Sequence, residues 1–172
     1  EIPEKQYYVI VPEQFSLEMQ RKIVKMHPRH GFFNIDVLSF HRLSYRIFAE
    51  CNYQPKEILE DLGVSMMLRK ILSEEEGDFL YFKKSMKKPG FIDELKSMLM
   101  EFIGYGVSWK QVEEVTKQLD ENKSLCNKCE ELGRIYERFE KAIEGRFMVT
   151  EQILDIAREF TGKAPMLKNA VF

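Results

Sequence analysis

YYVIVPEQFS, residues 7–16, is the stretch that decides the fold of the first third of the chain. Its first five residues form a short apolar run of β-branched and aromatic side chains, which is typical of a strand buried inside a parallel sheet. Pro12 ends this run because it cannot donate a hydrogen bond to a neighbouring strand. Apolar residues at helical spacing follow from Phe15 to Met26. We therefore predict a strand followed directly by a helix.

A second strand and a second helix are predicted from the next segment. Residues 33–38 contain alternating and adjacent apolar side chains, and Ser39 is a residue type that caps helices. The helix is expected to run from there to about Cys51. A strand–helix–strand–helix order favours a βαβ unit, in which the two strands lie parallel.

The remainder of the sequence has helical periodicity. Ser108 and Gln111 have the spacing of a capping box, and Thr150 is a further candidate cap. The expected helices cover residues 59–76, 91–102, 108–119, 125–144 and 150–160. We predict a mainly α fold with a small parallel β portion (α/β): a partial α/β domain at 1–56, a helical insertion at 57–165, and the start of a truncated strand at 166–172.

Composition limits the possible functions. The chain has 172 residues, with 26 Lys and Arg against 28 Asp and Glu, so its net charge of −2 excludes a globally basic nucleic-acid coat but permits a local basic groove. Three cysteines do not suit an extracellular disulfide framework, so we expect a reducing cytoplasm. No signal peptide or membrane span is predicted. Because the sequence starts at Glu1 and stops inside an apolar run, we expect a piece of a larger protein.

The recognisable motifs of catalysis are missing from the sequence. It contains neither the GxxxxGK[ST] nor the GxGxxG phosphate loop, and no HExxH motif. We therefore expect no complete catalytic site and no bound cofactor within these residues.

The segments that follow the two strands are the candidate site. In open α/β sheets, ligands bind beyond the carboxyl ends of the strands. Aromatic rings, amides and guanidinium groups are what single-stranded nucleic-acid sites use. Spacing alone favours a plainer interpretation, in which Phe15, Phe40 and Tyr45 are core residues and the arginines are solvated. The candidate DNA-binding residues are Gln14, Ser16, Ser39, Phe40, His41, Arg42, Tyr45 and Arg46.

Two further features leave alternatives open. Cys126 and Cys129 form a CxxC pair, but no second pair of ligands follows for a tetrahedral metal site, so we predict no metal. A lysine cluster at residues 83–88 is interleaved with Phe82 and Phe91. It could follow a DNA backbone, or it could be a solvated loop beside the acidic run at residues 74–76.

Four segments resemble one family over nearly the whole chain: YVIVPEQFSLEMQ (8–20), NIDVLSFHRLSYRIF (34–48), ILEDLGVSMMLRKIL (58–72) and FKKSMKKPGFIDELKSMLMEF (82–102). They are similar to the AddB (RexB-like) subunits of the bacterial AddAB helicase–nucleases. The motifs VPEQFS, SFHRLSYR and KKPGF carry most of the resemblance. The resemblance implies a partial P-loop helicase-like domain with an inserted helical bundle.

The resemblance also implies a function. AddB-type subunits work with an AddA-type helicase–nuclease in double-strand break repair by recombination, and they scan single-stranded DNA for a Chi-type hotspot. By matching motifs, Gln14 and Ser16 would contact bases, Arg42 would contact a guanine or a phosphate, and Phe40 and Tyr45 would stack. ATP, Mg and an iron–sulfur cluster are implied for the parent protein outside this segment, which by itself would not be catalytic. The alternative is a helical protein–protein docking module without direct DNA contact.

Overall fold

The chain forms two compact units. The computed structural model describes residues 5–28, 31, 34–74, 77, 79–118 and 123–172. The first unit combines Glu1–Pro55 with Ile153–Phe172, and the second consists of Lys56–Gln152. The second unit is therefore inserted into the chain of the first. Phe33, Glu75, Glu76 and Leu119, which the sequence analysis assigns to predicted elements, lie outside the described residues.

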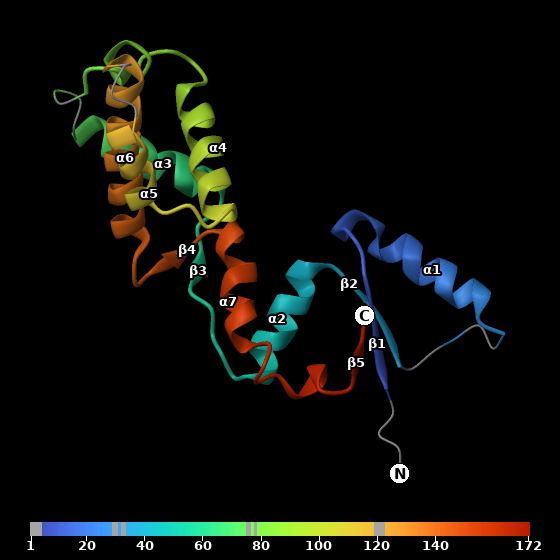
Figure 1. The fold of residues 1–172 in the computed structure, drawn as a ribbon. Coiled ribbons are helices and arrows are strands. Elements are labelled where there is room, and N and C mark those ends of the chain that lie inside the picture. Colours follow the sequence, from blue (N-terminus) through green and yellow to red (C-terminus); the bar gives the residue numbers. More distant parts are fainter. Residues whose placement is uncertain (1–4, 29–30, 32–33, 75–76, 78, 119–122) are drawn as a thin grey trace. The chain divides into compact units, whose positions relative to one another are not determined.

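A small parallel sheet organises the first unit (Figure 1). Its strands are β1 (Gln6–Ile10), β2 (Ile35–Leu38) and β5 (Ala170–Val171), in the order β2-β1-β5. Both pairings are parallel, and the register of β1 with β2 places Ile10 opposite Leu38. The predicted parallel pair and the strand predicted near the end of the sequence are both confirmed.

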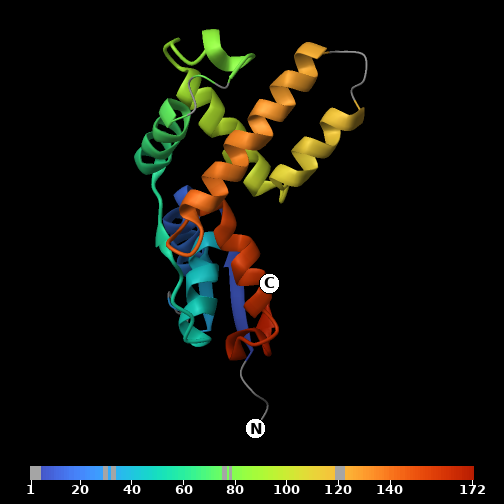
Figure 2. The ribbon, with the colours of Figure 1, turned by 90° about the vertical axis from the view of Figure 1, so that its left-hand side faces the viewer.

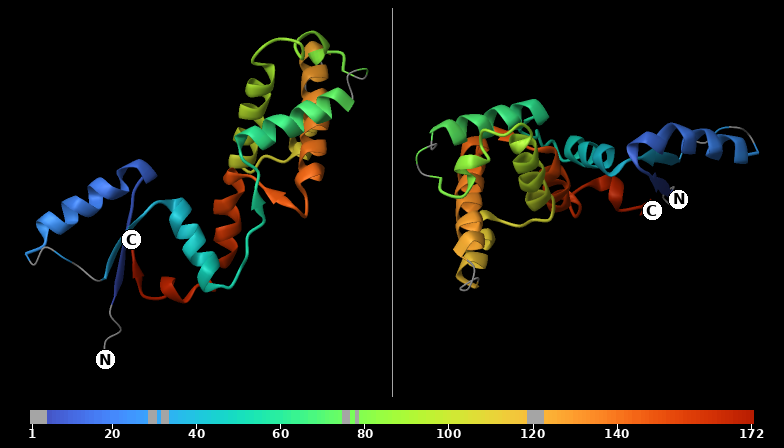
Figure 3. Two further views of the ribbon diagram at one scale, coloured as in Figure 1. Left: turned by 180° about the vertical axis from the view of Figure 1, so that it is seen from behind. Right: turned by 90° about the horizontal axis from the view of Figure 1, so that it is seen from above.

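Helices flank this sheet. The helical elements of the first unit are η1 (Glu13–Phe15), α1 (Ser16–Met26), α2 (Phe40–Glu50), α7 (Ile153–Phe160) and η4 (Pro165–Leu167), where η marks a 3₁₀ helix. α1 lies beside β2 (Figure 3), and α2 packs on α7. At the α2–α7 contact the Phe48 ring meets the Phe160 ring edge-on at 6.1 Å. Phe48 is 1% exposed, so this contact belongs to the core of the unit.

The elements of the second unit are helical apart from one short pair of strands, over the part of it that the structure describes. Its longest helix is α6, and α5 lies along it (Figure 2). The buried Tyr136 hydroxyl donates to the Val107 carbonyl at 2.8 Å, which attaches α6 to the segment before α5. The elements are β3 (Glu57–Ile58), α3 (Asp61–Glu74), η2 (Phe82–Lys84), α4 (Phe91–Gly104), α5 (Trp109–Gln118), α6 (Lys123–Ile143), β4 (Phe147–Met148) and η3 (Thr150–Gln152).

The pair β3–β4 joins the two ends of the second unit. It is parallel, with Glu57 opposite Phe147, and the Leu59 amide donates to the Met148 carbonyl at 2.8 Å. The sequence pattern does not predict these strands, because two residues are too few to show an alternation of apolar and polar side chains.

The mainly α fold with a small parallel β portion is confirmed. The division of the helices differs in one place. The helical insertion is predicted to reach residue 165, whereas the second unit ends at Gln152 because α7 packs on α2 in the first unit. In the described part of the chain, no helix is long and apolar enough to cross a membrane.

Candidate nucleic-acid interface

The segments that follow β1 and β2 meet at one edge of the sheet. The Val11 amide donates to the Leu38 carbonyl at 3.0 Å, so the parallel pairing continues to the end of both strands. We call Glu13–Ser16 and Ser39–Arg46 together the strand edge. It contains all eight of the candidate DNA-binding residues.

Three side chains connect the two segments of the strand edge. Ser39 is 5% exposed, caps α2 by accepting the Arg42 amide at 3.3 Å, and donates its own hydroxyl to Glu13 Oε2. Arg42 Nε lies 2.7 Å from Glu13 Oε1. The Glu13 carboxylate therefore binds both the cap and the first turn of α2.

Glu13 is the residue that the sequence analysis missed at this site. Its pKa is lowered from the ordinary value, chiefly by the hydrogen bond from Ser39 and less by the charge of Arg42, while partial desolvation opposes the shift. The available signal was complementary charge: a carboxylate in the first segment faces an arginine in the second, at the shared end of two predicted parallel strands.

Arg46 has a different environment from Arg42. Its Nη1 lies 2.5 Å from Asp36 Oδ2 on β2, and Asp36 also accepts a hydrogen bond from Gln6 at 3.0 Å. The Arg46 guanidinium lies 5.8 Å from the centre of the Tyr8 ring. These contacts attach Arg46 to the strands, so its first role is to fasten α2 to the sheet.

The aromatic residues of the strand edge are more exposed than spacing alone indicates. Phe15 is 47% exposed and Phe40 is 60% exposed, so their interpretation as core residues is wrong. Phe40 lies in the first turn of α2, just beyond β2, whereas Leu43, Ile47 and Phe48 are the apolar residues of that helix that reach the core. Tyr45 is 37% exposed, and its ring packs edge-on against His41 at 5.2 Å.

The polar residues of the first segment differ in burial. The Gln14 side chain is exposed, as a group that contacts a ligand requires. Ser16 is 5% exposed, and its hydroxyl has no hydrogen-bond partner among the described residues. Buried hydroxyl groups are ordinarily hydrogen-bonded, so the Ser16 hydroxyl is an exception among the described residues.

The CxxC pair shows no metal-site geometry. Cys126 and Cys129 are partly buried on α6, and Cys126 Sγ lies 3.8 Å from the Thr116 carbonyl oxygen. Over the described ranges, no three or more His, Cys, Asp or Glu side chains are grouped so as to hold a metal ion.

Comparison with known proteins identifies the family. The family described as "ADDB, N-terminal" matches residues 1–172. Three curated relatives, each named as a subunit of an ATP-dependent helicase/deoxyribonuclease, come from Lachnoclostridium phytofermentans, Acetivibrio thermocellus and Clostridium kluyveri. They are 36%, 32% and 30% identical over 90%, 94% and 99% of this chain. The aligned region covers 13%, 14% and 15% of the respective relatives. The chain belongs to the AddB N-terminal family.

Proposed function

We propose that this chain is the N-terminal part of one subunit of a helicase–nuclease, in which its strand edge binds single-stranded DNA. The observation that carries the proposal is the grouping, at one sheet edge, of exposed Phe15 and Phe40 with the exposed side chain of Arg42. Exposed aromatic rings give bases a stacking surface, which contributes about 1–3 kcal/mol per base in single-strand binding sites.

Arg42 is oriented for this role by Glu13. Their ion pair engages Nε, and the guanidinium group has further N–H donors for a guanine edge or a phosphate. The Arg42 side chain is 57% exposed, so a ligand can reach it. Glu13 thus reduces the net positive charge of the edge while fixing the direction of the guanidinium group.

The residue types support recognition of base sequence in addition to the backbone. Gln14 offers an amide that can bond to a base edge, and Arg42 offers a planar fork suited to guanine. We infer that the edge contributes to recognition of a Chi-type hotspot. Phe40 and Tyr45 would stack on bases, while Ser39 and Arg46 position α2 and His41 supports the Tyr45 ring.

The wider role follows the relatives' name. We infer that the whole protein is a cytoplasmic subunit of an ATP-dependent helicase–nuclease that acts in double-strand break repair with an AddA-type partner. ATP, Mg and an iron–sulfur cluster would bind outside residues 1–172. This chain would supply DNA contacts rather than catalytic groups.

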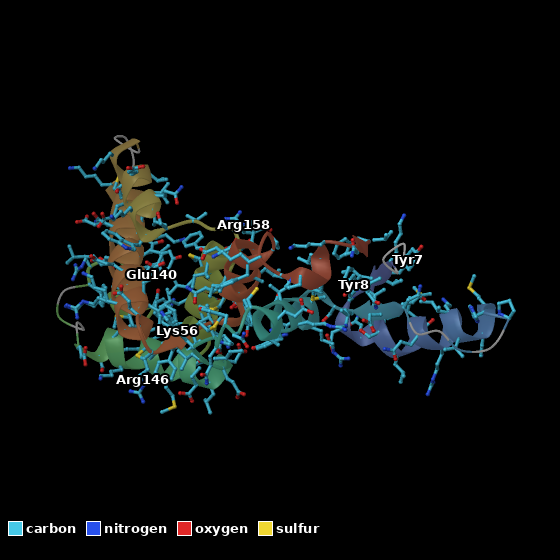
Figure 4. All side chains as sticks on the ribbon, turned by 90° about the horizontal axis from the view of Figure 1, so that it is seen from below. Tyr7, Tyr8, Lys56, Glu140, Arg146 and Arg158 are labelled. Atoms are coloured by element: carbon cyan, nitrogen blue, oxygen red, sulfur yellow. The ribbon has the colours of Figure 1, made fainter. Side chains whose placement is uncertain are left out.

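Binding of fluorescent single-stranded oligonucleotides to the full-length protein that contains this chain tests the proposal. Phe40→Ala and Arg42→Ala are each expected to weaken binding by roughly 5- to 150-fold, the range that corresponds to about 1–3 kcal/mol per lost contact. Matched controls are Tyr105→Ala, an 80% exposed aromatic residue of the second unit, and Arg158→Ala, an exposed arginine on α7 (Figure 4). Unchanged affinity in both test variants would overturn the proposal, and lost association with the AddA-type partner instead would favour a docking module.

A further inference from the structure

A second cationic surface lies on the helical unit, in the segment between α3 and α4. We call Tyr81–Pro89 the basic turn. Its lysines are all exposed at the side chain, and within 81–89 there is no acidic residue. These lysines are Lys83, Lys84, Lys87 and Lys88.

The start of the basic turn is fixed by a buried carboxylate. Glu131, on α6, is 5% exposed. Its Oε1 accepts the amides of Leu80 at 2.6 Å and Tyr81 at 2.7 Å, and its Oε2 accepts the amide of Phe82 at 3.0 Å. Three consecutive N–H groups around one carboxylate give the segment a defined backbone geometry.

The aromatic residues next to the lysines anchor the turn to the core of the helical unit. Phe82 is 6% exposed and Phe91 is 8% exposed, and their ring centres lie 5.4 Å apart in the core of the unit. These two rings therefore do not stack on a ligand. The exposed lysines are displayed on a segment whose backbone and apolar side chains are both fixed.

The turn borders a groove that a second lysine lines from another element. The groove has a volume of about 340 Å³, and its walls include Lys88 of the turn and Lys128 of α6, together with Ser85 and Tyr81. Among the described residues, no carboxylate forms an ion pair with Lys83, Lys84, Lys88 or Lys128. Glu94 is the acidic residue in the wall of the groove.

Another groove in the same unit has lysines that do form ion pairs with carboxylates. A groove of about 490 Å³ between α3 and α6 also contains lysines. There Lys70 lies 3.9 Å from Glu74, and Lys141 lies 2.8 Å from Glu137. The lysines of that groove are compensated by its own carboxylates, whereas Lys84 and Lys88 of the basic turn are available to an external anion.

We infer that the basic turn and its groove bind the phosphodiester backbone of a nucleic acid. Lysine ammonium groups contact phosphates as point charges and do not distinguish bases, so this contact would be independent of sequence. The exposed part of Tyr81 and the Ser85 hydroxyl add polar contacts next to Lys88 and Lys128. The choice of nucleic acid over an acidic protein rests on the proposed function, which places DNA on the same chain.

Salt dependence of binding by the full-length protein tests this inference. The double variant Lys84→Ala/Lys88→Ala is compared with Lys70→Ala/Lys141→Ala, which removes the same charge from the compensated groove. The probes are an oligothymidine strand and a blunt duplex. If both lysines contact phosphates, the slope of log K against log salt becomes shallower by about 1.4 for a single strand or about 1.8 for duplex DNA, and the probe that shows the change identifies the bound form.

Three outcomes would overturn the inference. The first is an unchanged slope and affinity with both probes. The second is an equal loss of affinity in the control variant Lys70→Ala/Lys141→Ala. The third is displacement of the DNA by polyglutamate of equal charge concentration, which would indicate an acidic protein as the ligand. The same titrations with Phe40→Ala separate the two sites, since loss of stacking weakens binding without changing the slope. An effect of the lysine variant alone would therefore refute the strand edge while supporting the basic turn, and the reverse result would do the opposite.

Discussion

The strand edge and the basic turn both carry cationic side chains, but they differ in whether these side chains form ion pairs with carboxylates. At the strand edge Arg42 and Arg46 each lie within 2.7 Å of a carboxylate oxygen, on Glu13 and Asp36 respectively. On the basic turn, Lys84 and Lys88 form no ion pair within the part of the chain that the structure describes. The aromatic residues of the two regions differ in exposure: Phe40 of the strand edge is exposed, whereas Phe82 of the basic turn is buried.

This difference separates orientation from attraction. A paired arginine loses part of its long-range field but gains a fixed direction, which suits recognition of a base. An unpaired lysine keeps its full field, which falls with salt and suits capture of any phosphate backbone. The anchors differ as well: Glu13 is an exposed carboxylate that a ligand can displace, whereas Glu131 is buried and structural.

The largest expected effect comes from removing the anchor of the basic turn. Glu131→Ala leaves the amides of Leu80, Tyr81 and Phe82 without their acceptor, which is expected to cost about 3 kcal/mol or more in the free energy of unfolding. Denaturant unfolding followed by circular dichroism measures this. The control is Glu130→Ala at the exposed neighbouring position, expected to change stability by less than about 0.5 kcal/mol. Equal effects of the two variants would show that Glu131 is not an anchor.

The anchor of the strand edge should matter less to stability. Ser39→Ala removes the cap of α2 and the hydrogen bond to Glu13, for an expected loss of about 1 kcal/mol. The same unfolding measurement applies. Ser73→Ala, an exposed serine near the end of α3, is the control and should be nearly neutral. A loss at Ser39 as large as that at Glu131 would remove the proposed contrast between the two anchors.

Changing the charge balance at the strand edge should alter DNA binding more than folding. Glu13→Gln removes the negative partner of Arg42. Single-stranded DNA is expected to bind a few-fold more tightly, because the positive charge of Arg42 is no longer compensated. Binding is also expected to show less sequence preference, because the guanidinium group is no longer held in one direction. Affinities for two oligonucleotides of different sequence measure both quantities. Glu18→Gln removes a carboxylate paired with Lys22 on α1 and is the control. Weaker binding by Glu13→Gln with unchanged preference would contradict the orienting role.

The smallest effect is a titration. The Glu13 pKa is held below its ordinary value, with the hydrogen bond from Ser39 as the larger cause and Arg42 as a smaller one. The link between the two segments should therefore be complete above the ordinary glutamate pKa and be lost as pH falls through the lowered value. Carboxyl NMR shifts follow this directly. Ser39→Ala should raise the Glu13 pKa more than Arg42→Ala does, and the reverse order would show that charge dominates.

Local signals in the sequence predict much of the fold. Ser39 is confirmed as the cap of α2, and the capping box is confirmed by the Ser108 amide bonding to Gln111 Oε1 at 2.8 Å. The parallel pairing of β1 and β2 is also confirmed. It was predictable because an apolar run ended by a proline and followed by a helix can be recognised within a short stretch of sequence. Each of these depends on residues close together in the chain.

Features that depend on distant residues could not be predicted. Glu131 binds amides that lie about fifty positions earlier, and nothing near Glu131 in the sequence marks it as buried. The packing of α7 on α2 likewise requires the chain to return after the whole second unit. At the strand edge, helical spacing assigns Phe40 to the apolar face of its helix but does not show that the sheet ends before this residue. Its exposure is therefore visible only in the structure.

The parallel pair β3–β4 has a consequence for the order of folding. Packing α2 against α7 requires closing a loop the length of residues 56–152, an entropic cost of about 4 kcal/mol for a flexible chain. Once β3 and β4 pair, Glu57 and Phe147 are neighbours and most of that closure has already taken place. The insertion would therefore act as a folding nucleus for the domain that surrounds it, and its early formation would speed the assembly of the strand edge.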